Sequence, residues 1–235
     1  MRMMVLCGVL VLGCAGLLGP GAFPELAPLV EADVRSDCAD GNSAACDAIA
    51  EAGDAASTEA EHLALYDLYL QACPAGSTRS CDRLGQNHVY GTLPDPTPEQ
   101  SYEALATACR GFDGGACYYA GSILAEGRLG EKDEPRAFEM FRTGCAQEHP
   151  LCCSWVGLMY QHGRGVEADP DLAFTLFKKG CALGEENVGC FNEAYILTGL
   201  PEAQQDRARI LALFQRSCDA GNALSCENLE ILQQP

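Results

Sequence analysis

Twelve of the fifteen cysteines in this chain of 235 residues form six pairs, and the pairs recur at a nearly constant interval. The two members of a pair are 8 residues apart in five pairs and 9 residues apart in one. The first members follow one another at steps of 35, 36, 36, 36 and 37 residues. Two coupled periods of this kind predict an array of repeats, each carrying its own disulfide. The pairs are Cys38 with Cys46, Cys73 with Cys81, Cys109 with Cys117, Cys145 with Cys153, Cys181 with Cys190, and Cys218 with Cys226.

The cysteine content also indicates an oxidising compartment, because so many thiols would be a redox hazard in a reducing cytosol. Structural zinc is the rival interpretation, but zinc usually takes four ligands, often from closely spaced C-x-x-C pairs. The sequence has no C-x-x-C, no paired histidines and no C-x-x-C-H haem attachment site. We therefore expect disulfides, and neither a metal nor any other cofactor.

The segment from Cys153 to Cys181 predicts two helices joined by a turn. Apolar residues recur at helical spacing after Cys153, and Gly163 is expected to end this first helix. Asp169 and Pro170 have the properties of an N-cap and a first helical residue, so they predict the start of the second helix. Each disulfide would then join the end of one repeat's second helix to the start of the next repeat's first helix.

Small residues recur at matching places in the other repeats. Four positions after the second cysteine, a small residue would let two helices approach closely: Ala50, Gly85, Gly121, Gly157 and Ala194. A glycine is expected to end each first helix: Gly53, Gly91, Gly127, Gly163 and Gly199. A further glycine stands three positions after the first cysteine in four repeats: Gly41, Gly76, Gly184 and Gly221.

These features resemble the Sel1-like repeat, a relative of the tetratricopeptide repeat, in Leu84-Gly85, in 163–166 and in Ala173-Phe174. The cysteine-stapled form is similar to the Helicobacter cysteine-rich protein family. The resemblance covers residues 35–235 and implies an all-α fold, a right-handed α/α solenoid of about five full repeats with a half unit at each end. The turn motif is clear only in the fourth repeat. An ordinary tetratricopeptide array is the structural rival, but its unit is typically about 34 residues and the longer steps here favour Sel1 repeats.

The N-terminus predicts export. Arg2 is followed by an apolar stretch, and residues 11–14 resemble the bacterial lipobox, in which the cysteine becomes lipidated. We interpret residues 1–13 as a signal peptide of the lipoprotein type and residues 14–34 as the lipidated Cys14 with a tether. The expected location is the cell envelope or periplasm, as a membrane-anchored lipoprotein. An ordinary secreted protein and an uncleaved anchor remain alternatives.

The remaining sequence argues against several classes of function. The net charge of −18 opposes binding to nucleic acid, which needs clustered Lys and Arg. The Helicobacter relatives have been linked to penicillin binding and slow β-lactam hydrolysis, so a β-lactam-binding or β-lactam-hydrolysing enzyme is the alternative function. The sequence has no S-x-x-K and no G-x-S-x-G, and its four histidines are scattered. A third interpretation follows the Sel1 proteins of the mitochondrial intermembrane space, although the lipobox-like start argues against it.

Cys152 is the cysteine left over once Cys7, Cys14 and the six pairs are assigned. It is expected to be a free thiol, either buried and idle, bridged to another chain, or reactive beside His149. Because Cys152 and Cys153 are adjacent, the pairing of Cys145 with Cys152 remains open.

The first helices are expected to line the concave face of the solenoid, as the resemblance implies. Positions two, five and nine after the second cysteine lie away from the packing positions, and aromatic and arginine side chains there are typical of interfaces. They could equally fill gaps between helices. The interpretation we adopt is a monomeric scaffold that binds a protein, an extended peptide or a cell-wall fragment and touches the membrane only through its lipid. The candidate binding residues are Arg83, Tyr90, Tyr119, Glu126, Trp155, His162, Asn192 and Tyr195.

Overall fold

The computed structural model describes residue 30 and residues 32–40, 42–55, 59–90, 98–111, 113–201 and 206–234. Within these ranges the regular structure is helical, and no strand occurs. The proposed signal peptide and Cys14 lie outside the described residues, as do Gly41 and Gly91. The all-α prediction is confirmed.

First and second helices alternate along the chain. The first helices are α2 (Ser43–Ala55), α4 (Thr78–Tyr90), α6 (Gly114–Glu126), α8 (Pro150–His162), α10 (Phe191–Thr198) and α12 (Ala223–Gln233). The second helices are α1 (Ala32–Ala39), α3 (Glu59–Ala72), α5 (Pro98–Arg110), α7 (Glu134–Ala146), α9 (Pro170–Ala182) and α11 (Arg207–Asp219). A π-helical turn, η2 (Glu186–Cys190), leads into α10.

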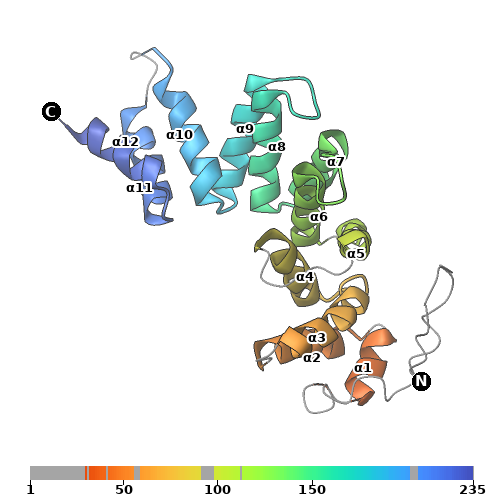
Figure 1. Ribbon diagram of the computed structural model, residues 1–235. Helices are drawn as coiled ribbons and strands as arrows, with labels where there is room; N and C mark the ends of the chain where they lie inside the picture. The colour runs from red at the N-terminus through yellow and green to blue at the C-terminus, as the bar shows by residue number, and fades with distance from the viewer. Residues whose placement is uncertain are drawn as a thin grey trace, which may run out of the picture.

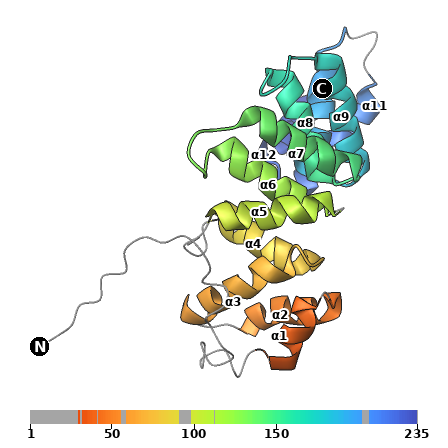
Figure 2. The ribbon, with the colours of Figure 1, turned by 90° about the vertical axis from the view of Figure 1, so that its right-hand side faces the viewer.

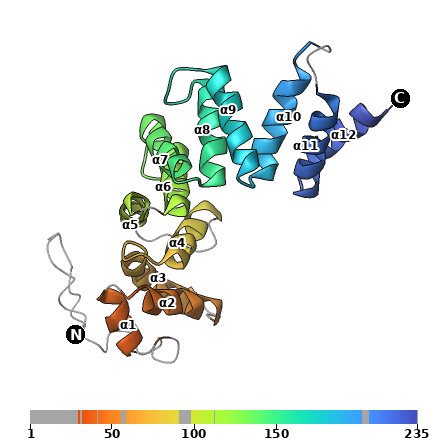
Figure 3. The ribbon, with the colours of Figure 1, turned by 180° about the vertical axis from the view of Figure 1, so that it is seen from behind.

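The helix pairs stack into a bent solenoid. The stack runs from α1 at one end to α11 and α12 at the other (Figure 1), and the helices from α1 to α9 rise in order when seen from the side (Figure 2). The views from the front and from behind agree that α4 and α6 lie on the inner side of the bend and α5 and α7 on its outer side (Figures 1 and 3). Each helix packs on the next, and α4 also packs directly on α6. The first helices therefore lie on the inner side in the central repeats, as a solenoid with an extended concave surface requires.

The helix ends follow the sequence signals in the best-marked repeat. The Asp169 carboxylate accepts hydrogen bonds from the N–H groups of Asp171 and Leu172, 3.1 and 3.0 Å away, and so caps α9. Gly163 ends α8 in the left-handed region at φ 65°, where glycine has no steric penalty. One prediction was wrong: Gly53 does not end its helix, because α2 continues through it to Ala55.

Glycines at the fourth position after the second cysteine allow the close approach of aromatic rings. A Cβ added to Gly121 would lie 2.6 Å from Phe141 Cε1, and one added to Gly157 would lie 2.8 Å from Phe177 Cε1. Both phenylalanines are fully buried. A methyl group at either glycine would therefore force a core ring, and the helix that carries it, to move.

The structure places all six predicted cysteine pairs at disulfide distance, with Cα separations from 4.5 to 4.8 Å. In each pair, one cysteine lies at the end of a second helix, or directly after it in the case of Cys73, and the other lies near the beginning of the next first helix or in η2. The bonded pairs are Cys38 with Cys46, Cys73 with Cys81, Cys109 with Cys117, Cys145 with Cys153, Cys181 with Cys190, and Cys218 with Cys226.

The fifth pair has a spacing of 9 residues instead of 8, and η2 explains how it still closes. A π-helical turn holds one more residue than an α-helical turn, so the extra residue is absorbed before Cys190. The disulfide therefore keeps the Cα separation of the other pairs although this repeat has one residue more.

Candidate binding surface

The candidate surface is one stripe along each first helix. Positions two, five and nine after the second cysteine are separated by three and four residues, so they lie on one side of a helix. The position two before that cysteine lies one turn earlier on the same side. We call the combined surface of these four positions on α2, α4, α6, α8, α10 together with η2, and α12 the first-helix face.

The candidate residues differ in how accessible they are. Glu126, His162 and Tyr195 are exposed, and Arg83 is half-buried. Asn192 is buried, and its side-chain amide donates to the carbonyl oxygen of Val188 at 2.8 Å. The amide of Asn192 is thus used within the protein, so it is poorly placed to meet a partner. The side chain of Tyr90 lies outside the described residues.

Tyr119 and Trp155 take part in packing between helices. The ring of Tyr119 lies over Gly85 of α4 so closely that a Cβ there would overlap it. Trp155 stacks on Phe141 of α7, with ring centroids 5.5 Å apart and an interplanar angle of 14°. Both side chains are half-buried, so each joins two helices and leaves only part of its ring for a partner.

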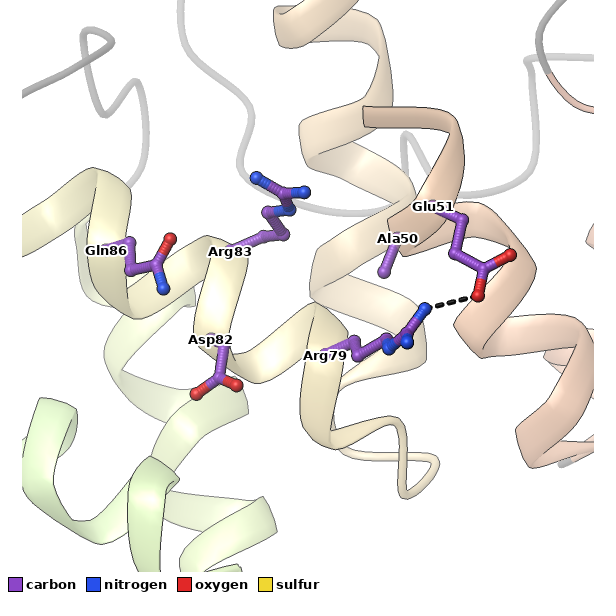
Figure 4. Close-up of a pocket in the computed structure, with 6 residues that line it drawn as sticks. All are labelled: Ala50, Glu51, Arg79, Asp82, Arg83 and Gln86. Atoms are coloured by element: carbon purple, nitrogen blue, oxygen red, sulfur yellow. Dashed lines mark hydrogen bonds and ion pairs between the residues drawn. The ribbon is translucent and has the colours of Figure 1, made fainter. Parts of the chain in front are cut away.

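A polar hollow lies between α2 and α4 (Figure 4). It has a volume of about 280 Å³ and is lined by Ala50, Glu51, Arg79, Asp82, Arg83 and Gln86. Arg79 forms an ion pair with Glu51 across the hollow (Figure 4). Burial raises the pKa of the Asp82 carboxyl, the negative charge of Asp113 raises it further, and Arg83 opposes both. Charged groups of both signs therefore meet at this end of the array.

A less polar hollow of about 370 Å³ lies at the N-terminal edge of α8 and η2. Pro150, Leu151 and Ala220 contribute its apolar wall. The buried Glu185 carboxylate accepts hydrogen bonds from the hydroxyl of Ser154 at 2.9 Å and from the N–H of Val188 at 3.0 Å. This acidic group of the hollow is thus occupied by the protein itself.

His149 also lines the second hollow. Burial lowers the pKa of His149, against the opposing effect of the Asp113 charge. Its ring stacks on Tyr118, with centroids 6.2 Å apart, and its Nδ1 is buried with no hydrogen-bond partner among the described residues. His149 is therefore part of the inter-repeat packing.

The free thiol of Cys152 has the surroundings of a packing residue. It is fully buried and donates to the carbonyl oxygen of Gly114 at 3.5 Å. Burial raises the pKa of this thiol well above its usual range. A reactive cysteine needs an accessible, stabilised thiolate, and Cys152 has neither property. In this structure Cys145 is bonded to Cys153, the pairing that keeps the repeat register.

The described residues contain no group of three or more His, Cys, Asp or Glu side chains that could hold a metal ion. In the same part of the chain, no helix is long and apolar enough to cross a membrane.

Reasoning from the sequence missed three residues of this surface and also Asp82, which stands one position after Cys81 and lies beside that surface. Arg79 and Asp82 line the polar hollow, and Leu224 and Ile231 of α12 are exposed. Ile231 stands five after Cys226, so the positions used in the sequence analysis would have found it if they had been extended to the sixth pair, whereas Leu224 stands two before Cys226 and would still have been missed.

Comparison with known proteins gives the family context. A Sel1 repeat family model matches residues 115–149 and 150–185, which are the helix pairs α6–α7 and α8–α9. A comparison with curated proteins finds no match.

Three solved structures resemble this fold. The Sel1 repeat protein from Oxalobacter formigenes has a TM-score of 0.64 and 20% identity, over 81% of this chain and 78% of its own. The protective antigen c5321 of uropathogenic Escherichia coli, which displays an SLR fold, has a TM-score of 0.58 and 17% identity, over 85% of this chain and 47% of its own. Cysteine-rich protein B of Helicobacter pylori has a TM-score of 0.49 and 21% identity, over 58% of this chain and 97% of its own. The chain therefore carries Sel1 repeats, and its helix pairs form a Sel1-type solenoid.

Proposed function

We propose that this protein is a scaffold of the cell envelope that binds an extended segment of a partner protein on its first-helix face. The exposed apolar side chains of that face are the observation that carries the proposal. Five large apolar side chains are exposed in the described part of the chain, and three of them, Tyr195, Leu224 and Ile231, belong to the first-helix face. Exposed large apolar side chains that share one side of the helices in an array are a typical feature of interaction sites.

The proposed location rests on the cysteines and on the N-terminal sequence. Six cysteine pairs at disulfide distance indicate an oxidising compartment. The lipobox-like sequence would place a lipid on Cys14 and hold a monomer at the membrane. Replacement of this residue (Cys14→Ser) is expected to release the protein from the membrane fraction. Retention of the variant there would argue for an uncleaved anchor.

No arrangement of side chains in the described ranges favours the β-lactam alternative, and we do not propose it. The function is tested by affinity capture from an envelope extract with oxidised protein (residues 15–235), followed by mass spectrometry. We expect a partner that the native protein holds and that the double variant, Tyr195→Ser with Ile231→Ser, loses. The matched control is Leu172→Ser, which removes an exposed leucine from α9, a second helix. Equal capture by both variants would contradict the proposal.

A further inference from the structure

Two of the four positions of the first-helix face change character along the array, whereas the positions two and nine after the second cysteine show no such change. The members of this face five positions after the second cysteine are, from α2 to α12, Glu51, Gln86, Ser122, Leu158, Tyr195 and Ile231. Its members two positions before that cysteine are Ala44, Arg79, Gly115, Leu151, Val188 and Leu224. At both positions the first three repeats have polar or small residues and the last three have large apolar ones. In both series, the change from polar or small residues to large apolar residues falls between α6 and α8.

Of the six large apolar members, Leu151, Leu158 and Val188 are half-buried and the other three are exposed. Tyr195, Leu224 and Ile231 are 55%, 55% and 65% exposed. Burying apolar surface of this kind is favourable by about 25 cal/mol per Å². In the first half of the array, Glu51 and Arg79 are exposed instead, and removing them from water would give no such gain. Binding would therefore be favoured by apolar side chains of a partner that pack on α10 and α12.

Carboxylates outnumber guanidinium groups around the polar end. Arg79 is neutralised by Glu51. The position of a Cβ on Gly115 would be 3.5 Å from Asp82 Oδ1 and 3.3 Å from Asp113 Oδ1, so these two carboxylates face the same small space. A single guanidinium, that of Arg83, opposes their mutual effect on the Asp82 carboxyl. The excess of negative charge there, within a chain of net charge −18, favours a cationic side chain from a partner.

The distance between the two ends sets the length of the ligand. With a helix spacing of about 8–10 Å per repeat, the four steps from α4 to α12 span roughly 32–40 Å. An extended chain advances about 3.3 Å per residue, so about ten to twelve residues would cover this span.

We propose that the first-helix face binds one extended polypeptide segment of about ten to twelve residues, with Lys or Arg over α4 and α6 and apolar side chains over α10 and α12. This inference rests on the proposed function, because it assumes that the first-helix face is the binding surface. It adds the composition of the ligand and the order of its two halves along the array.

The test uses two fluorescent twelve-residue peptides and the oxidised full chain. One peptide has three lysines in its first half and three leucines in its second half, separated by serines. The other has the same residues with lysines and leucines alternating. We expect anisotropy titration to show at least tenfold tighter binding of the segregated peptide. Equal affinity of the two peptides would overturn the inference.

Two variants test where the lysine half and the leucine half of the segregated peptide bind on the first-helix face. Ile231→Ser is expected to weaken binding of the segregated peptide at least fivefold, and Asp82→Asn at least threefold. Their controls, Leu172→Ser and Glu103→Gln, alter exposed residues of second helices and are expected to leave the affinity unchanged. An effect of the controls equal to that of the variants would overturn the inference.

Failure of this inference can be told apart from failure of the proposed function. If both peptides bind equally and Ile231→Ser weakens both, the face binds polypeptide without a preferred order, and only the inference fails. If neither peptide binds while the double variant, Tyr195→Ser with Ile231→Ser, loses a captured partner, again only the inference fails. If no variant of the first-helix face alters either measurement, both fail.

Discussion

The turn after Cys145 contains a residue that glycine should improve. Glu148 has a φ of 62°, and it is the one residue other than glycine with positive φ in the described ranges. It stands three positions after the first cysteine, where other repeats have Gly76, Gly184 and Gly221 at φ values of 106°, 100° and 92°. The turn thus requires a residue in the left-handed region, and this conformation is disfavoured for Glu148 because its side chain begins with a Cβ.

Replacing Glu148 by glycine is expected to stabilise the protein. The left-handed conformation costs a residue with a Cβ about 1–2 kcal/mol. Glycine loses about 0.5–1 kcal/mol more conformational entropy on folding, which offsets part of that gain. Glu148 is exposed, and its side chain makes no hydrogen bond or ion pair with the described residues that could be lost. The net effect is a gain of about 0.5–1 kcal/mol in the free energy of unfolding.

The assay is urea unfolding of the oxidised protein, followed by circular dichroism. With a denaturant slope of about 2 kcal/mol/M, the Glu148→Gly midpoint should rise by roughly 0.3–0.5 M. Gly184→Ala is the opposite control, because a Cβ there meets no atom within 4 Å and only the backbone conformation matters. It should lower stability by about 1 kcal/mol. A lower urea midpoint for Glu148→Gly would refute the conclusion that this turn requires a residue in the left-handed region.

Three further predictions concern packing and disulfides. Gly157→Ala should lower stability by about 1–3 kcal/mol, because its Cβ would lie 2.8 Å from Phe177 Cε1, and urea unfolding checks it. Removal of one disulfide, by Cys109→Ser together with Cys117→Ser, should lower the free energy of unfolding by about 2–3 kcal/mol in the same assay. Reduction of all six disulfides should abolish the helical circular dichroism. The thiol of Cys152 should resist iodoacetamide in the folded protein and react once it is unfolded, as mass spectrometry would show.

Each of these predictions has its own contrary result. Gly199→Ala is the control for the packing prediction, because its Cβ would meet only the carbonyl oxygen of Ile196, at 3.4 Å. Equal effects of the two glycine changes would mean that the Phe177 contact is unimportant. Helical circular dichroism that persists in strong reductant would show that the disulfides are dispensable. Alkylation of the native protein at Cys152 would contradict its burial.

The cysteine periodicity predicts the fold because each pair fixes the same local geometry. The turn in α8–α9 follows from residues with strong conformational preferences, Gly163, Asp169 and Pro170. The π-helical turn before Cys190 was not foreseen, because an insertion of one residue does not say which turn absorbs it. Gly53 was wrongly predicted to end its helix, because a glycine does not end a helix by itself and α2 continues to Ala55.

The binding surface was less predictable than the fold. Helical periodicity gives the side of a helix on which a residue lies, but burial depends on what the neighbouring helix brings to that side. Tyr119 is held over Gly85 and Trp155 over Phe141, although their positions belong to the same stripe as exposed ones. Whether each ring is buried depends on residues of the neighbouring helix, and local sequence patterns do not identify those residues.

Site-specific photo-crosslinking would show which surface of the solenoid touches a partner. A benzoyl-phenylalanine at position 195 would probe the first-helix face, and one at position 172 would probe the exposed surface of α9. Both proteins would be irradiated in an oxidising envelope preparation and the adducts sequenced. We predict that position 195 crosslinks an extended segment of a partner protein and that position 172 does not. Crosslinking of the same segment from position 172 alone, or equally from both positions, would contradict the account.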